Sequence, residues 1–560
     1  MSASLAPLTA AAVVCRSVNR DVDALDHVVL RISAFLDHAS PQFWRISLAC
    51  ACSRHVSLLQ RLSPRESPTM DPFRKAAEFS AALMYAVACY GEDNANAMEV
   101  IQWLHEYCPH GFASRGFEVA AGLGLLTYLQ WLAKHHSNIV WTTTLMDGAA
   151  ASGHLHVLEW LKVQPMSPGF THRAMDFAAK GGHMETVVWL HDSGARSKHA
   201  VENAITSGHL EIAKFLLAHD HPLKVSPAMD YAAMNNHLDV LKWLHENAIA
   251  GGTKDAMDSA AGNGHLHIVQ WLHANRFEGC SVGAMNNAAG NGHLDVVQWL
   301  HANRSEGCTH DAMDRAARQG FLEVVQWLHD NRLEGCTSDA MDGAAENGQF
   351  KVVKWLHAHR TEGCTSAAVD KAAGNGHLLI AEWIVENRGV EYTRRAMNLA
   401  AAHGHLNVVQ WLHENRSEGC TTSAMDWAAV NNHLDVVKWL HAHRTEGCTT
   451  DAMDNAGSLA VIQWLHTHRS EGCTTKAMDF AVSVGDFDRV LFLHANRSEG
   501  CSSQVTESAN YERNVELFLW LCEHYPIVMD VNAEKAALLD TYLECMGLHP
   551  KYQICFMAKR

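Results

Sequence analysis

The sequence has little that would suit it to nucleic acid or to a membrane. Acidic residues outnumber basic ones, which gives its 560 residues a formal net charge of −17, and runs of lysine or arginine are absent. Because proteins bind phosphate backbones through basic stripes, this balance predicts no nucleic-acid partner. No apolar stretch approaches the roughly 20 residues that cross a bilayer. We therefore expect a soluble protein with no membrane partner.

Motifs of the common catalytic and metal sites are also missing. The sequence contains no phosphate-binding loop, no His-Glu-x-x-His and no Gly-x-Ser-x-Gly, so we expect neither an enzyme nor a cofactor. Its sixteen cysteines include no Cys-x-x-Cys pair, which disfavours a zinc site. The first residues, MSASLAPLTAAAVVCRS, have no basic residue before the small-residue run, which argues against a secretory signal. The protein is therefore expected inside the cell, in the cytoplasm or the nucleus.

What the sequence has in abundance is one short phrase. GHLDVVQWLHANRSEGCT at 292–309 has near copies that begin at 264 and 404. Its tryptophan position recurs mostly every 28 residues. That position is held by Trp103, Trp131, Trp160, Trp189, Phe215, Trp243, Trp271, Trp299, Trp327, Trp355, Trp383, Trp411, Trp439, Trp464, Phe492 and Trp520. A fixed period of this size is typical of a solenoid, so residues 76–526 predict an all-α array of about sixteen stacked units.

Each unit predicts two helices. The first carries Ala-Met-Asp-x-Ala-Ala after a threonine such as Thr309, which we expect to be its N-cap. Gly292 ends that helix, and because Asn236 and Asn432 replace glycine in other units, this position is predicted to have a positive φ. Apolar residues of the second helix, 294–300, cover an arc of about 220°. Such a helix must contact its own first helix and both neighbouring units.

The repeated blocks resemble the ankyrin repeat. SAMDWAAVNNHLDVVKWLH at 423–441 shares its Ala-Ala pair, its break and its second helix, with Ala-Met-Asp where the family has Pro-Leu-His. The ankyrin period is about 33 residues, so the shorter period here places the loss in the connector, which in ankyrins is a β-hairpin finger. The resemblance implies shortened, tryptophan-rich repeats with short or absent fingers. It further implies a monomeric, non-enzymatic protein-protein interaction scaffold that binds its partner on the concave face.

The two ends of the chain do not follow the repeat. Residues 527–560 predict a final capping helix, and residues 1–75 predict either a helical cap or a second module. Within them, residues 25–62 resemble an F-box, which docks a target-binding protein onto a ubiquitin ligase, although Asp26 and His27 depart from that motif. The matching positions are Leu25, Val28, Leu30, Ile32, Phe35, Leu36, Trp44, Ile46 and Leu48. The alternative function is therefore a substrate-recognition adaptor of a cullin-type ubiquitin ligase, with ligase subunits as partners, and a secreted effector is the third.

Cysteine and histidine recur at fixed positions of the unit. Stacked helices lie ~8–10 Å apart and a disulfide needs Cα atoms within ~7 Å, so the repeated cysteines are expected to be reduced and to fill a turn. Histidines gather at the break, as His293, and near the end of the second helix, as His301. Neutral imidazoles at the break are predicted to bond the backbone of the adjacent turn. Acid below pH ~6 is then predicted to destabilise the array, because buried imidazoles must charge.

Specificity is expected where the units differ. The variable positions follow Ala-Met-Asp and precede the break, and aromatic and arginine residues are frequent energetic anchors of interfaces. We predict a partner groove across residues 313–453, while neutral drift between duplicated repeats stays open as the other explanation. The predicted partner-binding residues are Tyr231, Met234, Asn235, Arg315, Arg318, Gln319, Glu346, Asn347, Lys371, His403, Trp427, Val430 and Asn431. The unit at 452 lacks three residues and its break, which predicts a weak point or a bend.

Overall fold

The computed structural model of the chain describes most of the repeat region. It covers residues 71–89, 95–107, 114–135, 141–165, 167, 169–223, 228–249, 251–505 and 515–525, with isolated positions between 46 and 63. The described residues are helices and connecting turns without a strand, as short or absent fingers require. None of these helices combines the length and the apolar character that spanning a membrane requires. The chain forms two compact units, residues 1–200 with 503–560, and residues 201–502.

First and second helices alternate along the chain. The first helices are α5 (Pro72–Cys89), α7 (Ser114–Gly122), α9 (Thr143–Ala151), α11 (His172–Gly181), α13 (Ala200–Thr206), α15 (Ala228–Met234), α17 (Lys254–Gly262), α19 (Val282–Gly290), α21 (Asp311–Gln319), α23 (Ser338–Glu346), α25 (Ser366–Gly374), α27 (Arg394–Ala402), α29 (Thr422–Val430), α31 (Asp451–Asp454) and α33 (Thr475–Ser483).

The second helices are α6 (Ala95–Tyr107), α8 (Leu126–His135), α10 (Leu155–Lys162), α12 (Met184–Asp192), α14 (Leu210–Ala218), α16 (Leu238–Glu246), α18 (Leu266–Asn275), α20 (Leu294–Asn303), α22 (Leu322–Asn331), α24 (Phe350–His359), α26 (Leu378–Arg388), α28 (Leu406–Asn415), α30 (Leu434–His443), α32 (Leu459–His468), α34 (Phe487–Asn496) and α36 (Val515–His524). Fifteen pairs and α36 confirm the predicted α-solenoid of helical repeats.

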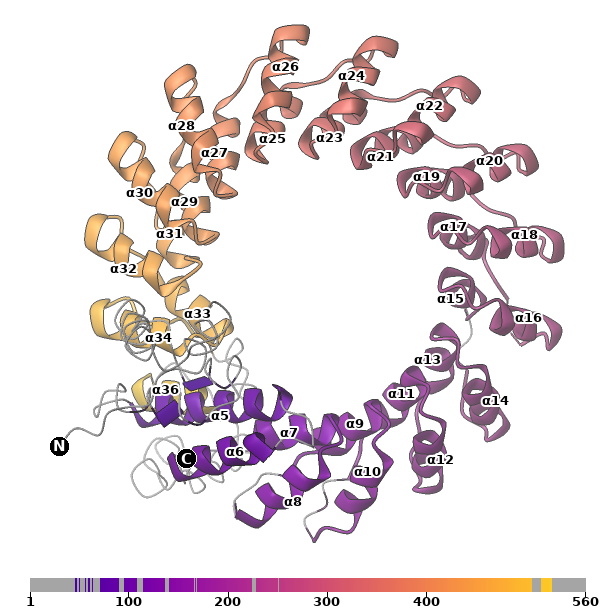
Figure 1. Cartoon of the computed structure of the whole chain (residues 1–560), viewed down its shortest axis with the longest axis vertical. Helices are drawn as coiled ribbons and strands as arrows, with labels where there is room; N and C mark the ends of the chain where they lie inside the picture. Colours follow the sequence, from indigo (N-terminus) through magenta and orange to yellow (C-terminus); the bar gives the residue numbers. More distant parts are fainter. Residues whose placement is uncertain are drawn as a thin grey trace, which may run out of the picture. The chain divides into compact units, whose positions relative to one another are not determined.

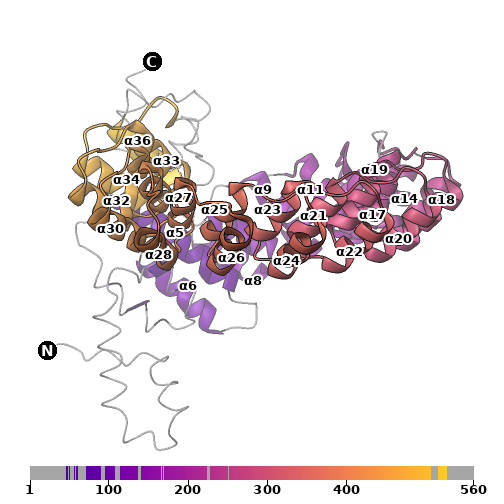
Figure 2. The same cartoon turned by 90° about the horizontal axis from the view of Figure 1, so that it is seen from above.

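Within residues 201–502 the two kinds of helix lie on opposite sides of the array. The first helices follow one another along the inner side of the curve and the second helices along its outer side (Figure 1). Figure 2 shows the same pairs from the edge. From α15 to α31, each first helix packs against the first helix of the next unit and against its own second helix. Alanine permits this close approach: Ala316 and Ala317 of α21 are fully buried, as are their counterparts along the array.

The helix ends have the local chemistry that the sequence predicts. The hydroxyl of Thr337 caps α23 by accepting from the backbone N–H of Asp339 at 3.1 Å. The Thr309 hydroxyl accepts from the Asp311 N–H at 3.3 Å, but α21 begins one residue later than predicted, with His310 at its N-cap position. At the predicted left-handed position φ is 83° for Gly292, 69° for Asn236 and 66° for Asn432. Because other residues with a Cβ are strained in that region, the break selects glycine or asparagine.

A buried acid ties each unit to the next. Asp314 of the Ala-Met-Asp segment accepts from the backbone N–H and from the hydroxyl of Thr337, both at 2.8 Å. Where Asn286 replaces the acid, its Oδ1 accepts from Thr309 N–H and its Nδ2 donates to the Thr309 hydroxyl, both at 2.9 Å. The same pairing recurs along the array, so this Asp–Thr ladder is a regular joint between units. Burial raises the pKa of Asp370 within it.

The histidines at the break act mainly through their shape. A Cβ placed on Gly264 would lie 2.6 Å from Nδ1 of His293, so the imidazole lies directly over the glycine of the preceding unit. Phe321 fills the same position over Gly292. A backbone bond of the predicted kind joins His265 Nε2 to the Met234 carbonyl at 3.2 Å, and it has no counterpart at the other break histidines of residues 228–449. The prediction of a general backbone bond was therefore wrong, since ring packing on glycine is the shared feature.

The shortened unit is bridged by a side chain of the following unit. Arg489 of α34 donates from Nη1 to the Ala456 carbonyl at 2.7 Å and from Nη2 to the Gly457 carbonyl. The Gly457 N–H in turn donates to the Ala429 carbonyl at 2.9 Å. These bonds satisfy the backbone that the missing break leaves open, so the gap at the predicted weak point is closed.

In the unit of residues 1–200 and 503–560, two buried glutamates hold other segments against α5. Glu78 Oε1 accepts from the backbone N–H of Ser47 at 2.8 Å and from its hydroxyl at 2.6 Å. Glu516 of α36 accepts from the Ser80 hydroxyl at 2.6 Å. Residues 25–62 otherwise lie almost wholly outside the described residues, as do residues 527–560, so the F-box, the caps and the domain boundaries stay predictions.

Candidate partner-binding face

The variable positions of neighbouring units interdigitate on the first helices. The residue after Ala-Met-Asp packs beside the residue that ends the first helix of the preceding unit. A Cβ on Gly290 would lie 2.9 Å from Cβ of Arg315, and a Cβ on Gly343 would lie 3.0 Å from Cβ of Arg318. In these two pairs a large residue faces a glycine, whereas Glu346 and Lys371, at the same two positions of α23 and α25, are both large.

Two charged residues of this face, Lys371 and Arg315, have partners within it. Lys371 Nζ lies 2.7 Å from Glu346 Oε2, across the α23–α25 contact. Arg315 donates to Asn287 Oδ1 at 2.9 Å and pairs with Asp311 at 3.3 Å. Such partly exposed pairs stabilise a protein by at most about 1 kcal/mol. They orient the side chains of α19–α25 more than they stabilise the fold.

Three of the predicted partner-binding residues form hydrogen bonds to backbone carbonyls of the preceding unit. Asn347 Nδ2 donates to the Arg318 carbonyl at 3.0 Å, and Asn431 Nδ2 donates to the Ala402 carbonyl at 2.8 Å. His403 Nδ1 lies 2.9 Å from the Gly374 carbonyl. Each of these bonds satisfies a carbonyl at the end of the preceding first helix. Asn347, Asn431 and His403 therefore join units, and any contact with a partner would be an additional role.

The large apolar candidates are exposed but lie apart. Tyr231 and Trp427 are each 41% exposed. They belong to α15 and α29, which are separated by many units, so the structure does not bring them into one patch. Met234 and Val430 are half-buried near them, and Asn235 bonds the Tyr231 carbonyl of its own helix at 2.9 Å. Between these ends, Arg318 and Gln319 are exposed. The role of all these residues in binding stays a prediction.

Sequence reasoning missed a second network, on the second helices. The His301 ring meets the Trp327 ring of the next unit edge-on, with 5.3 Å between centroids. Its Nδ1 lies 3.4 Å from Nη1 of Arg332, which donates to it while the imidazole is neutral. Arg332 pairs in turn with Glu334. The recurring Asn-Arg-x-Glu-Gly-Cys phrase was the available signal, because its Arg and Glu stand two residues apart.

The repeated cysteine lies beside this arginine. A Cβ on Gly307, next to Cys308, would lie 2.6 Å from Nη2 of Arg332. Burial raises the pKa of the Cys336 thiol to about 11, so the thiol is protonated at neutral pH. The hydrogen bond from Arg304 lowers the pKa of Glu306 to about 2. The thiols therefore fill turns, and the described cysteines of this position are free.

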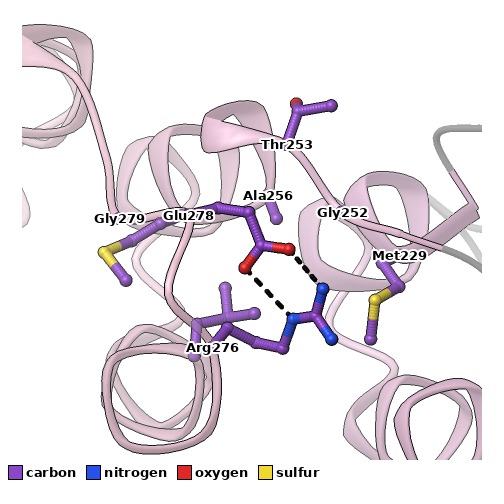
Figure 3. A pocket seen from close by; sticks show the side chains of 9 residues that line it. Met229, Gly252, Thr253, Ala256, Arg276, Glu278 and Gly279 are labelled. Atoms are coloured by element: carbon purple, nitrogen blue, oxygen red, sulfur yellow. Dashed lines mark hydrogen bonds and ion pairs between the residues drawn. The ribbon is translucent and has the colours of Figure 1, made fainter. Parts of the chain in front are cut away.

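A small cavity and a cluster of possible metal ligands lie among the described residues. The cavity of Figure 3, bounded by Met229, Gly252, Thr253 and the Arg276–Glu278 pair, has a volume of about 10 Å³. That volume holds at most one water-sized molecule. The carboxylates of Asp311 and Asp314 approach His310, but Arg315 pairs with Asp311 and Thr337 occupies both oxygens of Asp314. These polar bonds account for the cluster without an ion.

No curated protein matches the sequence. Among solved structures, the maize pentatricopeptide repeat protein PPR10 shares 11% identity over 91% of this chain and 83% of that one, with a TM-score of 0.29. PPR10 in complex with an 18-nucleotide psaJ RNA element shares 10% identity over 84% and 88%, with a TM-score of 0.27. A cysteine-substituted form with the same RNA gives the same values. At these TM-scores the likeness assigns no ligand to this chain.

The sequence-based prediction of no nucleic-acid partner is withdrawn, and two of the similar structures are pentatricopeptide repeat proteins in complex with RNA. The exclusion relied on the net charge of the whole chain, which does not describe any one face. Arg315, Arg318 and Arg395 are exposed on first helices despite the acidic total. Nucleic acid is therefore among the ligands that a binding experiment has to test.

The sequence itself matches ankyrin repeat families. A family of three ankyrin repeats matches residues 369–454, and a family of many ankyrin repeats matches residues 198–245, 229–273, 257–301 and 284–329. Repeats of this kind are typically scaffolds rather than enzymes. The helix pairs and glycine breaks extend in the same form beyond the matched residues. The matched segments are similar to ankyrin repeats.

Proposed function

We propose that the protein is a non-enzymatic, intracellular scaffold that binds a partner protein along the first helices α21–α29. The observation that carries this proposal is the continuous inner face on which variable side chains of neighbouring units interlock. A partner laid across that face would contact several units at once, because every unit touches only its neighbours.

The side chains of this face suit protein recognition. Arg315, Arg318 and Trp427 are exposed there, and arginine and tryptophan are enriched among the residues that dominate interface energies. Pairs such as Glu346–Lys371 hold charged side chains in place before binding. Side chains that are already ordered lose less conformational entropy when a partner docks.

Affinity capture with the full chain tests the proposal. The inner-face variant carries Arg318→Glu and Trp427→Ala, and the matched outer-face control carries Lys438→Glu on α30, which is also exposed. We expect the inner-face variant to lose at least one protein that the control retains. Each capture is run with and without nuclease. Equal capture by both variants, or capture that nuclease abolishes, would contradict binding of a protein by this face.

The ubiquitin-ligase adaptor remains the second candidate from the sequence, and no described contact favours it. It depends on residues 25–62. Capture of ligase core subunits by the full chain, lost on Leu30→Ala with Phe35→Ala, would support it. Capture without ligase subunits would leave the N-terminal segment as a cap.

A further inference from the structure

An arginine after the second helix pairs with a glutamate in seven units. The pairs are Arg276–Glu278, Arg304–Glu306, Arg332–Glu334, Arg360–Glu362, Arg444–Glu446, Arg469–Glu471 and Arg497–Glu499. Figure 3 shows the geometry for Arg276, whose guanidinium faces both carboxylate oxygens of Glu278. This two-bond arrangement is the strongest that an arginine makes with a single acid.

The unit that contains α26 has the arginine without the glutamate. Arg388 is followed by Gly389 and Val390, where the preceding unit has Thr361 and Glu362. Gly389 has a φ of 66°, which lets α26 continue through Arg388, whereas the other second helices with this arginine end one residue before it. Glu391 is exposed and forms no ion pair with Arg388 in the described structure. The guanidinium therefore keeps its charge with no internal carboxylate.

Donors of Arg388 are left without acceptors. Its Nε and Nη2 are buried and have no hydrogen-bond partner in the described part of the chain, and the same is true of Nδ1 of His357. Elsewhere this pair of side chains bonds directly, as Arg360 Nη1 and His329 Nδ1 do at 3.4 Å. A buried charged donor without an acceptor is unfavourable, so an anion that reached these donors would be stabilised by them.

Arg388 does not lie where the arginine of a regular unit lies. A Cβ on Gly335 would lie 2.5 Å from Nη2 of Arg360, but a Cβ on Gly363, one unit later, would meet nothing within 4 Å. Cys364 is correspondingly half-buried, whereas the seven other cysteines of its position are buried. The Arg388 side chain is itself only half-buried. His357, Gly363, Cys364 and Arg388 are all half-buried, and we call this part of the unit the Arg388 notch.

We propose that the Arg388 notch binds the carboxylate of an acidic side chain on a partner protein. The argument for a carboxylate is internal, because the equivalent arginine takes a glutamate carboxylate in seven units of the same chain. The guanidinium fork matches the two oxygens of that group. This proposal rests on the proposed protein-binding function, and it extends that function to the side of the array that carries the second helices.

Titration of the full chain with small anions tests the notch without a partner. In ¹⁵N-arginine-labelled protein at pH 7 and constant ionic strength, the Nε–H resonance of Arg388 is assigned by its loss in Arg388→Lys. We expect sodium acetate and N-acetylglutamate amide to shift it saturably, with midpoints on the order of millimolar. Inorganic phosphate serves as the competing oxyanion. A response to phosphate alone, or no saturable response, would overturn the proposal.

Two reciprocal variants control for unspecific shifts. Gly389→Ser with Val390→Glu writes the Arg-Ser-Glu of residues 304–306 into this turn and should abolish the response of Arg388. Ser305→Gly with Glu306→Val should create a response at Arg304, in a unit that has none. Retention of the response in the first variant would also overturn the proposal. Because neither titration contains a partner, they stay informative if affinity capture finds no protein.

Discussion

Two irregular units show that chain length is a poor guide to where this array of helical repeats is weak. The unit of α31 and α32 lacks three residues and its break, yet Arg489 satisfies the exposed carbonyls of Ala456 and Gly457. The unit of α25 and α26 has full length, yet Nε and Nη2 of Arg388 and Nδ1 of His357 have no hydrogen-bond partner among the described residues. The two units differ in whether a neighbouring side chain reaches the groups that the irregularity exposes, and a deletion need not leave such groups unpaired.

The largest expected effect is a difference in stability between variants of Arg489 and Arg388. Arg489→Ala removes the donors to two carbonyls and should destabilise α31–α32 by about 3 kcal/mol. Arg388→Ala removes a group with no acceptor and should change stability by less than about 1 kcal/mol. Hydrogen exchange of amides in each unit measures both. Similar exchange in the two variants would show that the comparison is mistaken.

The Asp–Thr ladder provides the next largest effect, in the regular units. Asp342→Ala leaves the Thr365 N–H and hydroxyl without their acceptor and should cost about 2 kcal/mol. Asp342→Asn should cost less than about 1 kcal/mol, because Asn286 and Asn398 already form the same two bonds. Urea unfolding of the two variants tests the difference. An equal loss from both would mean that charge, rather than the pair of bonds, is what matters.

Acid should weaken the regular units through the histidines at the break. Burial lowers the pKa of His265 and of His405, so the folded state holds fewer protons than the unfolded state. The corresponding stability is present above the unfolded pKa of about 6.5 and is lost as the pH falls below it. We expect the melting temperature to drop between pH 7 and pH 5, where Glu306, with a pKa of about 2, stays ionised.

Replacement by phenylalanine isolates this contribution. His265→Phe with His405→Phe should flatten the pH dependence while keeping the packing, since Phe321 occupies the same position. The control His443→Gln changes an exposed imidazole and should leave the slope as it is. If both variants keep the parental slope, other groups are responsible. The ladder acids do not explain a loss in acid, because the raised pKa of Asp230, Asp370 and Asp426 has the opposite sign.

The smallest expected effect is a gain. Gly389→Ser with Val390→Glu gives Arg388 the acid of the regular units and should stabilise its unit by about 0.5–1 kcal/mol. The matched change in a regular unit, Ser305→Gly with Glu306→Val, should lose a similar amount. Thermal melts of the pair measure both. A loss of stability in the first variant would show that the conformation of this turn depends on Gly389 and not on the absence of the acid.

The sequence predicts the features that depend on local sterics and on periodicity. Helix pairs, threonine caps and the positive φ of Asn236 follow from residues that are close together in the chain. The Asp–Thr ladder could not be assigned in this way, because Asp314 and Thr337 are 23 residues apart and either has several local roles. The constant offset between these two residue types was the signal that could have revealed it.

The candidate site was predictable as a face but not as a set of free side chains. Variation between units correctly marks positions on neighbouring first helices. It does not distinguish Asn347, which donates a hydrogen bond to the carbonyl of Arg318 near the end of α21, from Gln319, which is exposed. At the break, Phe321 and Gln349 replace histidine in two units. This replacement already indicated that packing of the side chain matters more there than the hydrogen bonds that histidine can form. For the variable positions and for the break, the role of each side chain depends on its contacts with the neighbouring unit.

The Asp–Thr ladder also bears on how such a chain changes length. Each unit offers the same acceptor to the unit after it and the same donors to the unit before it. The bond between Asp454 and Thr474 keeps this form across the shortened unit, where the two residues are 20 apart instead of 23. Removing or duplicating one whole unit would bring together two ends that already fit. Recombination can therefore lengthen or shorten the gene by a unit without creating an unpaired joint.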